Sequence, residues 1–81
     1  DVPTAFTVRG KTVIVESEQL AAALLRLPEK RCEVLFLRYY LGYSDTEICQ
    51  ICGISRSAVF RRRKVALHLL RKEMEALENE E

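Results

Sequence analysis

The stretch that decides the fold is SDTEICQICGISRSAVFRRRKVAL, residues 44–67. It opens with a capping-box pattern, in which the Ser44 hydroxyl accepts from the Glu47 amide and the Glu47 carboxylate accepts from the Ser44 amide. Gly53 supplies the backbone conformation of a sharp turn, and Ser55 is a good cap for another helix two residues later. The stretch therefore predicts a short helix that ends near position 52, a tight turn and a second helix that begins at position 56.

The small and apolar residues of this stretch fall in the register of a helix-turn-helix, in which two helices cross closely. We expect the core and crossing positions to be Ile48, Cys49, Cys52, Ile54 and Val59. The second helix is expected to end near position 76, and at 100° per residue one of its faces is apolar. That face carries Val59, Ala66, Leu70, Met74 and Leu77, and the opposite face carries Ser57, Arg61, Lys64 and His68. A helical hairpin around a glycine, without the DNA-binding role that a helix-turn-helix usually has, is the alternative that these residues leave open.

Arg63 is a cation that the same periodicity places on the apolar face. Such a side chain either lies along its helix or pairs with a carboxylate. We expect it either to lie along the helix or to pair with a carboxylate such as Glu47 or Asp45. We favour this structural role over direct contact with DNA, which the second helix of a helix-turn-helix commonly makes.

Charge is distributed unevenly along the second helix. Five cations fall within residues 56–64, whereas five glutamates fall within the last nine residues of the chain, a tail that we expect to fray. The second helix of a helix-turn-helix enters the DNA major groove, so the basic run predicts a DNA-binding surface. The candidate DNA-binding residues are Arg56, Ser57, Phe60, Arg61, Arg62 and Lys64. Arg56 and Arg61 are suited to guanine, Phe60 to a thymine methyl, Ser57 to a base or phosphate, and Arg62 and Lys64 to phosphates.

The first part of the chain predicts a short extended arm or β-hairpin and then a helix. β-branched and aromatic residues at 5–9 and 12–15 flank Gly10 and Lys11. Ser17 is placed to cap a helix over 18–26. The buried side of this helix is expected to carry Leu20, Ala21, Leu24 and Leu25.

The next predicted helix, over 28–41, has two apolar stripes and so is expected to be buried on two sides, between the first helix and the helix-turn-helix. One stripe is Cys32, Leu35, Phe36 and Tyr39, and the other is Val34, Leu37 and Leu41. Gly42 is placed to close this helix. The sequence therefore predicts a mainly α fold: a four-helix domain with a helix-turn-helix over 17–81, preceded by an arm or hairpin over 1–16.

Length, composition and cysteine content argue against a membrane-spanning protein and against a metal or redox protein. The chain has 81 residues, a formal net charge of +1 and 48% hydrophobic residues, and its apolar runs are too short for a bilayer span of roughly 20 residues. Because it begins with Asp1, we expect a fragment of a longer protein. The three cysteines fit a reducing cytoplasm, and we interpret the C-x-x-C of Cys49 and Cys52 as core residues rather than metal ligands or a redox pair. No catalytic constellation, cofactor motif or metal-ligand spacing is evident, so we expect a protein that is not an enzyme.

Residues 27–72, LPEKRCEVLFLRYYLGYSDTEICQICGISRSAVFRRRKVALHLLRK, resemble region 4 of the sigma-70 family of bacterial transcription initiation factors. LPEKR resembles that family's helix opening, YSDTEI its entry to the turn motif, and GISRS the start of its recognition helix. The segment FTVRGKTVIVESEQLAAAL, residues 6–24, is similar to short sigma-like proteins carried by conjugative elements.

The resemblance implies that the helix from Arg56 reads an upstream promoter element and that apolar surface elsewhere docks on the flap of RNA polymerase. Family base contacts would fall on Arg56, Ser57, Phe60 and Arg61. Phe60 departs from the polar residue often found at its position, and Arg62 and Arg63 stand where an apolar residue is usual. The sequence preference and the helix packing of this chain are therefore expected to differ. Nothing in the sequence resembles the region that melts promoter DNA.

Two alternatives remain open from the sequence. A response-regulator output domain has a similar opening and turn, although it usually lacks the basic run and the Leu-Pro pair. A protein-interaction or dimerisation module would use the helix over 28–41, with its two apolar stripes, and the edge of the extended arm. The expected partners are therefore double-stranded DNA and RNA polymerase, with a homodimer as an alternative, no membrane contact, and a cytoplasmic location.

Overall fold

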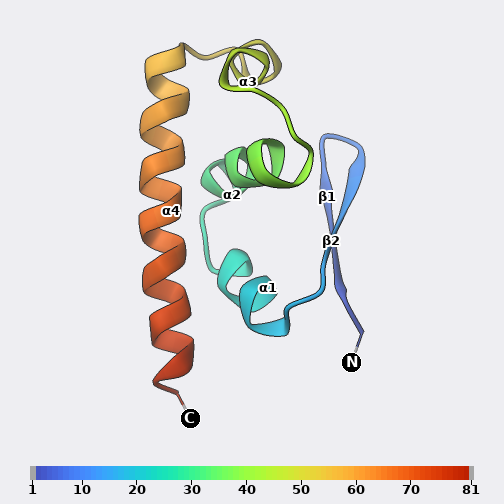
Figure 1. The fold of residues 1–81 in the computed structure, drawn as a ribbon, viewed down its shortest axis with the longest axis vertical. Coiled ribbons are helices and arrows are strands. Elements are labelled where there is room, and N and C mark those ends of the chain that lie inside the picture. Colours follow the sequence, from blue (N-terminus) through green and yellow to red (C-terminus); the bar gives the residue numbers. More distant parts are fainter. Residues whose placement is uncertain (1, 81) are drawn as a thin grey trace.

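The structure is a computed structural model that describes residues 2–80, and it has the predicted mainly α architecture (Figure 1). Two strands precede the helical part. The elements in chain order are β1 (Thr4–Val8), β2 (Lys11–Val15), α1 (Glu18–Leu25), α2 (Glu29–Leu35), the π-helical segment η1 (Phe36–Tyr40), α3 (Asp45–Cys52) and α4 (Arg56–Glu78).

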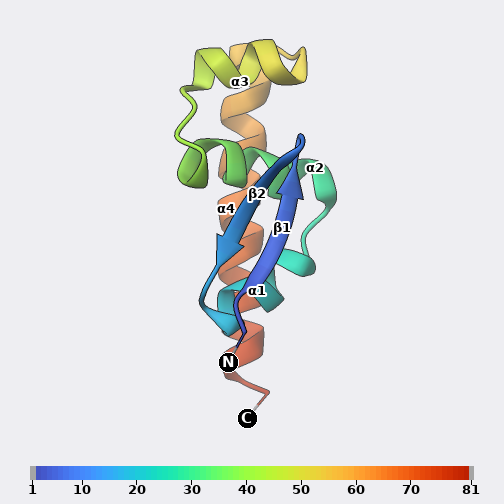
Figure 2. The same ribbon diagram turned by 90° about the vertical axis from the view of Figure 1, so that its right-hand side faces the viewer.

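The elements form three layers, and α4, the longest helix, is one of the two outer layers. In Figure 1, α3, α2 and α1 are stacked along one side of α4, and the hairpin covers α2 and α1 on the side away from α4. Figure 2 shows the hairpin in front of the helices, with α4 behind them. The two ends of the chain lie at the same end of the molecule, opposite to α3. The helix α2 therefore lies between α1 and α3, as predicted, although α4 and the hairpin also cover it.

The amino-terminal segment is a β-hairpin rather than a single extended arm. β1 and β2 are antiparallel, with Val8 opposite Lys11, so the turn consists of Arg9 and Gly10. The sequence suggested Gly10 and Lys11 instead. Both turn residues have positive φ, 50° and 81°, which is typical of a two-residue hairpin turn whose twist matches that of its strands.

One hydrophobic core joins the hairpin to the helices. Isolated two-stranded hairpins are marginal in water, and here the inward side chains supply the packing that makes this one stable. The phenyl rings of Phe6 and Phe36 lie 4.8 Å apart between their centroids, which fixes β1 against the start of η1. The buried members of the core are Val8, Val13, Val15, Ala21, Leu24, Leu27, Cys32, Leu35, Phe36, Leu37, Ile48, Val59 and Ala66.

Two residues of the expected core are on the surface. Leu25 is 67% exposed, because α1 turns Ala21, Ala23 and Leu24 inward instead. Tyr39 is 53% exposed because the helix does not continue with α-helical spacing after Leu35. The Leu41 amide donates to the Phe36 carbonyl five residues earlier, and this wider turn rotates the following side chains away from the predicted stripe.

The long helix also differs slightly from the prediction at its end. It continues to Glu78, and the Glu80 carboxylate lies 3.0 Å from the Arg26 guanidinium. The helix is therefore longer than predicted, and Glu80 beyond it pairs with Arg26, the residue that follows α1. Among the helices of residues 2–80, none combines the length and the apolar composition that a bilayer crossing requires.

Candidate nucleic-acid interface

The first helix of the helix-turn-helix begins with the predicted capping box. The Glu47 amide donates to Ser44 Oγ at 3.2 Å, and the Ser44 amide donates to the Glu47 carboxylate at 2.9 Å. These amides are two of the donors that a helix start leaves without a partner inside the helix. The backbone N–H of Ser44 also lowers the pKa of Glu47, since it stabilises the charged carboxylate. The start of α3 is therefore held by its own side chains.

The turn between α3 and α4 is also as predicted. Gly53 ends α3 in the left-handed conformation, with φ 67° and ψ 36°, and its amide donates to the Cys49 carbonyl. Ser55 then accepts from the Ala58 amide at 3.1 Å and so caps α4. Because both helix ends are fixed two residues apart, the direction of α4 is set relative to α3.

The crossing of α3 and α4 rests on two fully buried side chains, Ile48 and Val59. Ile54, Cys49 and Cys52 are only half-buried. The Cys52 sulfur lies 3.8 Å from a carboxylate oxygen of Glu33 in α2, and burial together with that carboxylate raises the thiol pKa. Within residues 2–80 no three His, Cys, Asp or Glu side chains come together as a metal site.

The predicted DNA-binding residues occupy the amino-terminal part of α4, at the end of the molecule that also carries α3 (Figure 1). Five of the six are exposed: Arg56, Ser57, Phe60, Arg61 and Lys64. Arg62 is half-buried and faces the side of α4 that lies beside α2. Neighbouring cations flank the Phe60 ring, with Lys64 Nζ 5.3 Å and Arg63 Cζ 5.6 Å from its centroid. The surface is thus cationic and has one aromatic ring at its edge.

Arg63 has the structural position that its periodicity predicted. Its guanidinium donates to the Asp45 carboxylate at 2.9 Å, and its side chain is 19% exposed. Burial acts to lower the pKa of Arg63, but the Tyr39 hydroxyl and the Asp45 carboxylate outweigh it, and the pKa is raised. Arg38 approaches the same carboxylate at 3.7 Å. The charge of Asp45 is therefore balanced by arginines of the protein itself.

The structure adds one cation that the sequence did not single out. Arg31, near the start of α2, lines a shallow groove of about 310 Å³ together with Ala58, Arg61, Arg62 and Val65. Three guanidinium groups from two helices thus share one depression beside the exposed face of α4. In the sequence, only the adjacent cations Lys30 and Arg31 could have indicated this contribution to the cationic surface. Their position relative to α4 depends on tertiary packing.

Comparison with known proteins agrees with this geometry. The family model "Sigma-70, region 4" matches residues 17–70, which is more than half of the chain. No curated protein and no solved structure gives a significant match. The match covers α1, α2, the capping box, the Gly53 turn and most of α4. The chain therefore belongs to the sigma-70 region 4 family of DNA-binding helix-turn-helix domains.

Proposed function

We propose that the chain is a sequence-specific transcription factor that inserts the start of α4 into the major groove of a promoter element. The observation that carries this proposal is the exposed cationic face of α4. Arg56, Arg61 and Lys64 form no ion pair within residues 2–80, whereas the nearby Asp45 is already paired with Arg63. Cations that no internal carboxylate neutralises attract a polyanion and release its counterions on binding.

The roles of the individual side chains follow from their positions on α4. Arg61 and Arg56 present planar guanidinium groups that match the two acceptors on the major-groove edge of guanine. Ser57 shares the exposed face, and Phe60 at its edge is suited to a thymine methyl. Lys64, Arg62 and Arg31 are placed to hold phosphates on either side, and the start of α4 adds free backbone amides. These groups bind and position DNA, and none of these roles is enzymatic.

A contact with RNA polymerase in the cytoplasm is the second part of the proposal. The family resemblance implies such a contact through an apolar surface. An apolar groove of about 290 Å³ lies between α1, η1 and the middle of α4, lined by Leu20, Leu24, Leu35, Tyr39, Tyr40, Leu67 and Leu70. All seven of these residues lie outside the basic run 56–64, so DNA and a protein partner would use different residues.

Selection of bound duplexes from a random DNA pool tests the proposal, first with the protein alone and then with RNA polymerase present. A single enriched hexamer, recovered more strongly with polymerase, is the expected result. Recovery of a palindrome would instead favour a dimeric regulator of the response-regulator kind. A protein that retains no duplex at low salt would exclude DNA recognition and leave the apolar groove as evidence for an interaction module.

A further inference from the structure

The hairpin turn contains an arginine in a backbone conformation that arginine rarely adopts. Arg9 has φ 50°, and within residues 2–80 every other residue with positive φ is a glycine. Asn, Asp and Gly are the residues that usually occupy this turn position. Side chains with a Cβ are strained in the left-handed region, and such strain persists where surrounding contacts determine it. The geometry of the turn alone therefore does not explain why an arginine occupies this position.

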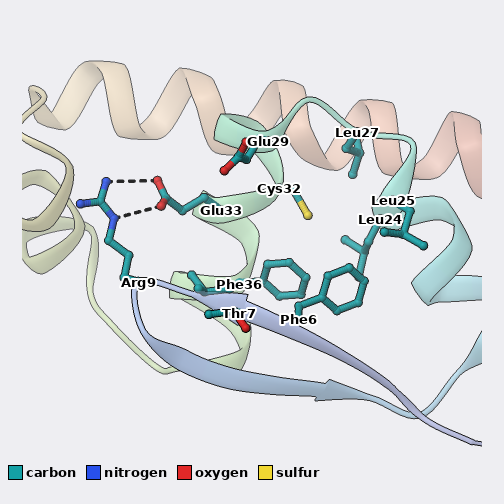
Figure 3. Close-up of a pocket in the computed structure, with 11 residues that line it drawn as sticks. Phe6, Thr7, Arg9, Leu24, Leu25, Leu27, Glu29, Cys32, Glu33 and Phe36 are labelled. Carbon is teal, nitrogen blue, oxygen red and sulfur yellow. Dashed lines mark hydrogen bonds and ion pairs between the residues drawn. The ribbon is translucent and has the colours of Figure 1, made fainter.

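The Arg9 guanidinium joins the hairpin turn to two helices. Its Nε and Nη2 donate to the two carboxylate oxygens of Glu33 in α2, at 2.9 and 3.3 Å, as Figure 3 shows. Its Nη1 donates to the Ile51 carbonyl in α3 at 3.3 Å. The paired contact with Glu33 fixes the plane of the guanidinium, so that the third donor is directed at α3.

The Ile51 carbonyl lies in the last turn of α3, where carbonyls have no partner inside the helix. A cation there also interacts favourably with the helix dipole. The contact lies two residues before Gly53, where the chain turns into α4, and Glu33 also lies 3.8 Å from the Cys52 sulfur. Arg9 and Glu33 thus meet the end of α3 immediately before the turn.

A second contact, made by Lys11 at the start of β2, reaches the segment that leads into α3. Lys11 Nζ donates to the Tyr43 hydroxyl at 2.6 Å and lies 5.2 Å from the centroid of the Tyr43 ring. Tyr43 directly precedes Ser44, the residue that caps α3. The hairpin therefore contacts the residue just before the cap of α3, through Lys11, and the last turn of α3, through Arg9.

We propose that Arg9 is a positioning residue of the helix-turn-helix: through Glu33 and the Ile51 carbonyl it fixes α3, and thereby the start of α4, for DNA binding. This inference rests on the proposed function. It makes the hairpin part of the DNA-reading unit although the hairpin side chain itself does not contact DNA.

Two substitutions separate positioning from its alternatives. Arg9→Asn retains a residue that suits the turn but removes both contacts, and Glu33→Ala removes the carboxylate while Arg9 keeps its charge. We expect each to weaken binding to the selected duplex by roughly three- to thirtyfold. The result for Glu33→Ala is decisive, because loss of a negative charge by itself should strengthen binding to DNA. If Arg9 contacted DNA directly, Arg9→Asn would weaken binding and Glu33→Ala would not, and the inference would be overturned.

Amide hydrogen exchange of the free variants supplies a readout that does not depend on DNA. Exchange at Gly53 and Ile54 should become faster in both variants, whereas exchange in α1 should not change, and circular dichroism should show that both remain folded. The matched control is Arg26→Gln. Arg26 follows α1 and is ion-paired with glutamates at the far end of α4, so its loss should change neither the affinity for the duplex nor the exchange at Gly53 and Ile54. Unchanged exchange at the turn would overturn the inference. If the wild-type protein binds no duplex, the proposed function fails, while the exchange experiment still decides whether Arg9 holds α3.

Discussion

The two ends of α4 carry opposite charges, and these charges differ in whether they are paired within the protein. At the start of the helix, Arg56, Arg61 and Lys64 form no ion pair within the part of the chain that the structure describes. At the other end, Glu73 and Glu80 approach the guanidinium of Arg26 at 3.4 and 3.0 Å. The helix has 23 residues and is therefore about 34 Å long, so each end experiences mainly its own charges.

This difference separates charges that organise the protein from charges that remain for a partner. The Arg26 pairs join α1 to the end of α4, and the Arg63–Asp45 pair joins the start of α3 to α4. The unpaired cations lie on the same helix, but within residues 2–80 none of them forms an ion pair that joins two elements. A net charge of +1 for the whole chain conceals this division. The following experiments test the difference between the two ends, beginning with the largest expected effect.

The packing beneath the basic end can be removed directly. Ile48 is fully buried between α3 and α4, so Ile48→Ala should lower the free energy of unfolding by about 2–5 kcal/mol. Denaturant unfolding measures the change. Leu25→Ala is the matched control, because Leu25 is 67% exposed and its loss should have little effect. Similar losses for both substitutions would contradict the observed core.

The base-reading role of the basic end predicts different responses at Arg61, which lies in it, and at Arg71, which lies outside it. Arg61→Ala should cost about 1–3 kcal/mol in binding to the selected duplex and should relax the preference at one base pair. Arg71→Ala removes the same charge from an exposed position further along α4 and should change the base preference at no position. Binding titrations with the selected duplex and single-base variants measure both. Equal effects of the two substitutions would show that only overall charge matters.

The caps at the basic end have a smaller effect on stability. Ser44→Ala should cost about 1 kcal/mol, because the Glu47 amide loses its acceptor, while DNA contacts stay in place. The pKa of Glu47 is lowered in the folded protein, so its contact stabilises the fold above the unfolded pKa near 4.3 and is lost as the pH falls through the folded pKa. Thermal unfolding across the acidic range should therefore show a weaker pH dependence in a variant with Glu47→Gln. An unchanged melting temperature for Ser44→Ala would argue against the cap.

Phosphate contacts predict a uniform effect. Lys64→Ala should weaken binding to every duplex alike and reduce the slope of log affinity against log salt by about one. Titrations at several salt concentrations, with the selected duplex and a scrambled one, measure this slope. A loss confined to the selected duplex would move Lys64 into the base-reading group.

Substitutions at the acidic end of α4 should have almost no effect on the affinity for DNA. Arg26→Gln breaks both ion pairs with the tail, but these pairs are exposed and screened by solvent, so we expect only a slight loss of stability. The affinity for DNA should not change, because the site lies at the other end of α4. A clear loss of affinity would mean that the two ends are coupled through the helix.

Local signals predicted much of this architecture. The capping box at Ser44, the left-handed Gly53 and the Ser55 cap are determined by neighbouring residues, and each occurs in the structure where the sequence indicated it. The helical period predicted the position of Arg63, and the structure resolves the choice of partner in favour of Asp45. The DNA-contacting roles of Arg56, Ser57, Phe60, Arg61, Arg62 and Lys64 remain predictions, although five of these side chains are exposed.

The features that the sequence did not reveal depend on contacts between distant residues. Arg31 approaches Arg61 and Arg62 only because α2 packs against α4. Arg9 and Glu33 are 24 residues apart, and no periodicity connects them. The wider turn after Leu35 has no local residue signal either, and it was the reason that Tyr39 was wrongly expected in the core.

The reactivity of the buried Cys32 thiol can be used to detect unfolding of the domain. Burial raises its pKa to about 11, so only a very small fraction is present as the reactive thiolate at neutral pH. Cys49 and Cys52 are half-buried beside the turn and need smaller movements to become accessible. The order in which an alkylating reagent modifies the three cysteines would therefore distinguish loosening of the helix-turn-helix from unfolding of the whole domain, without any added label.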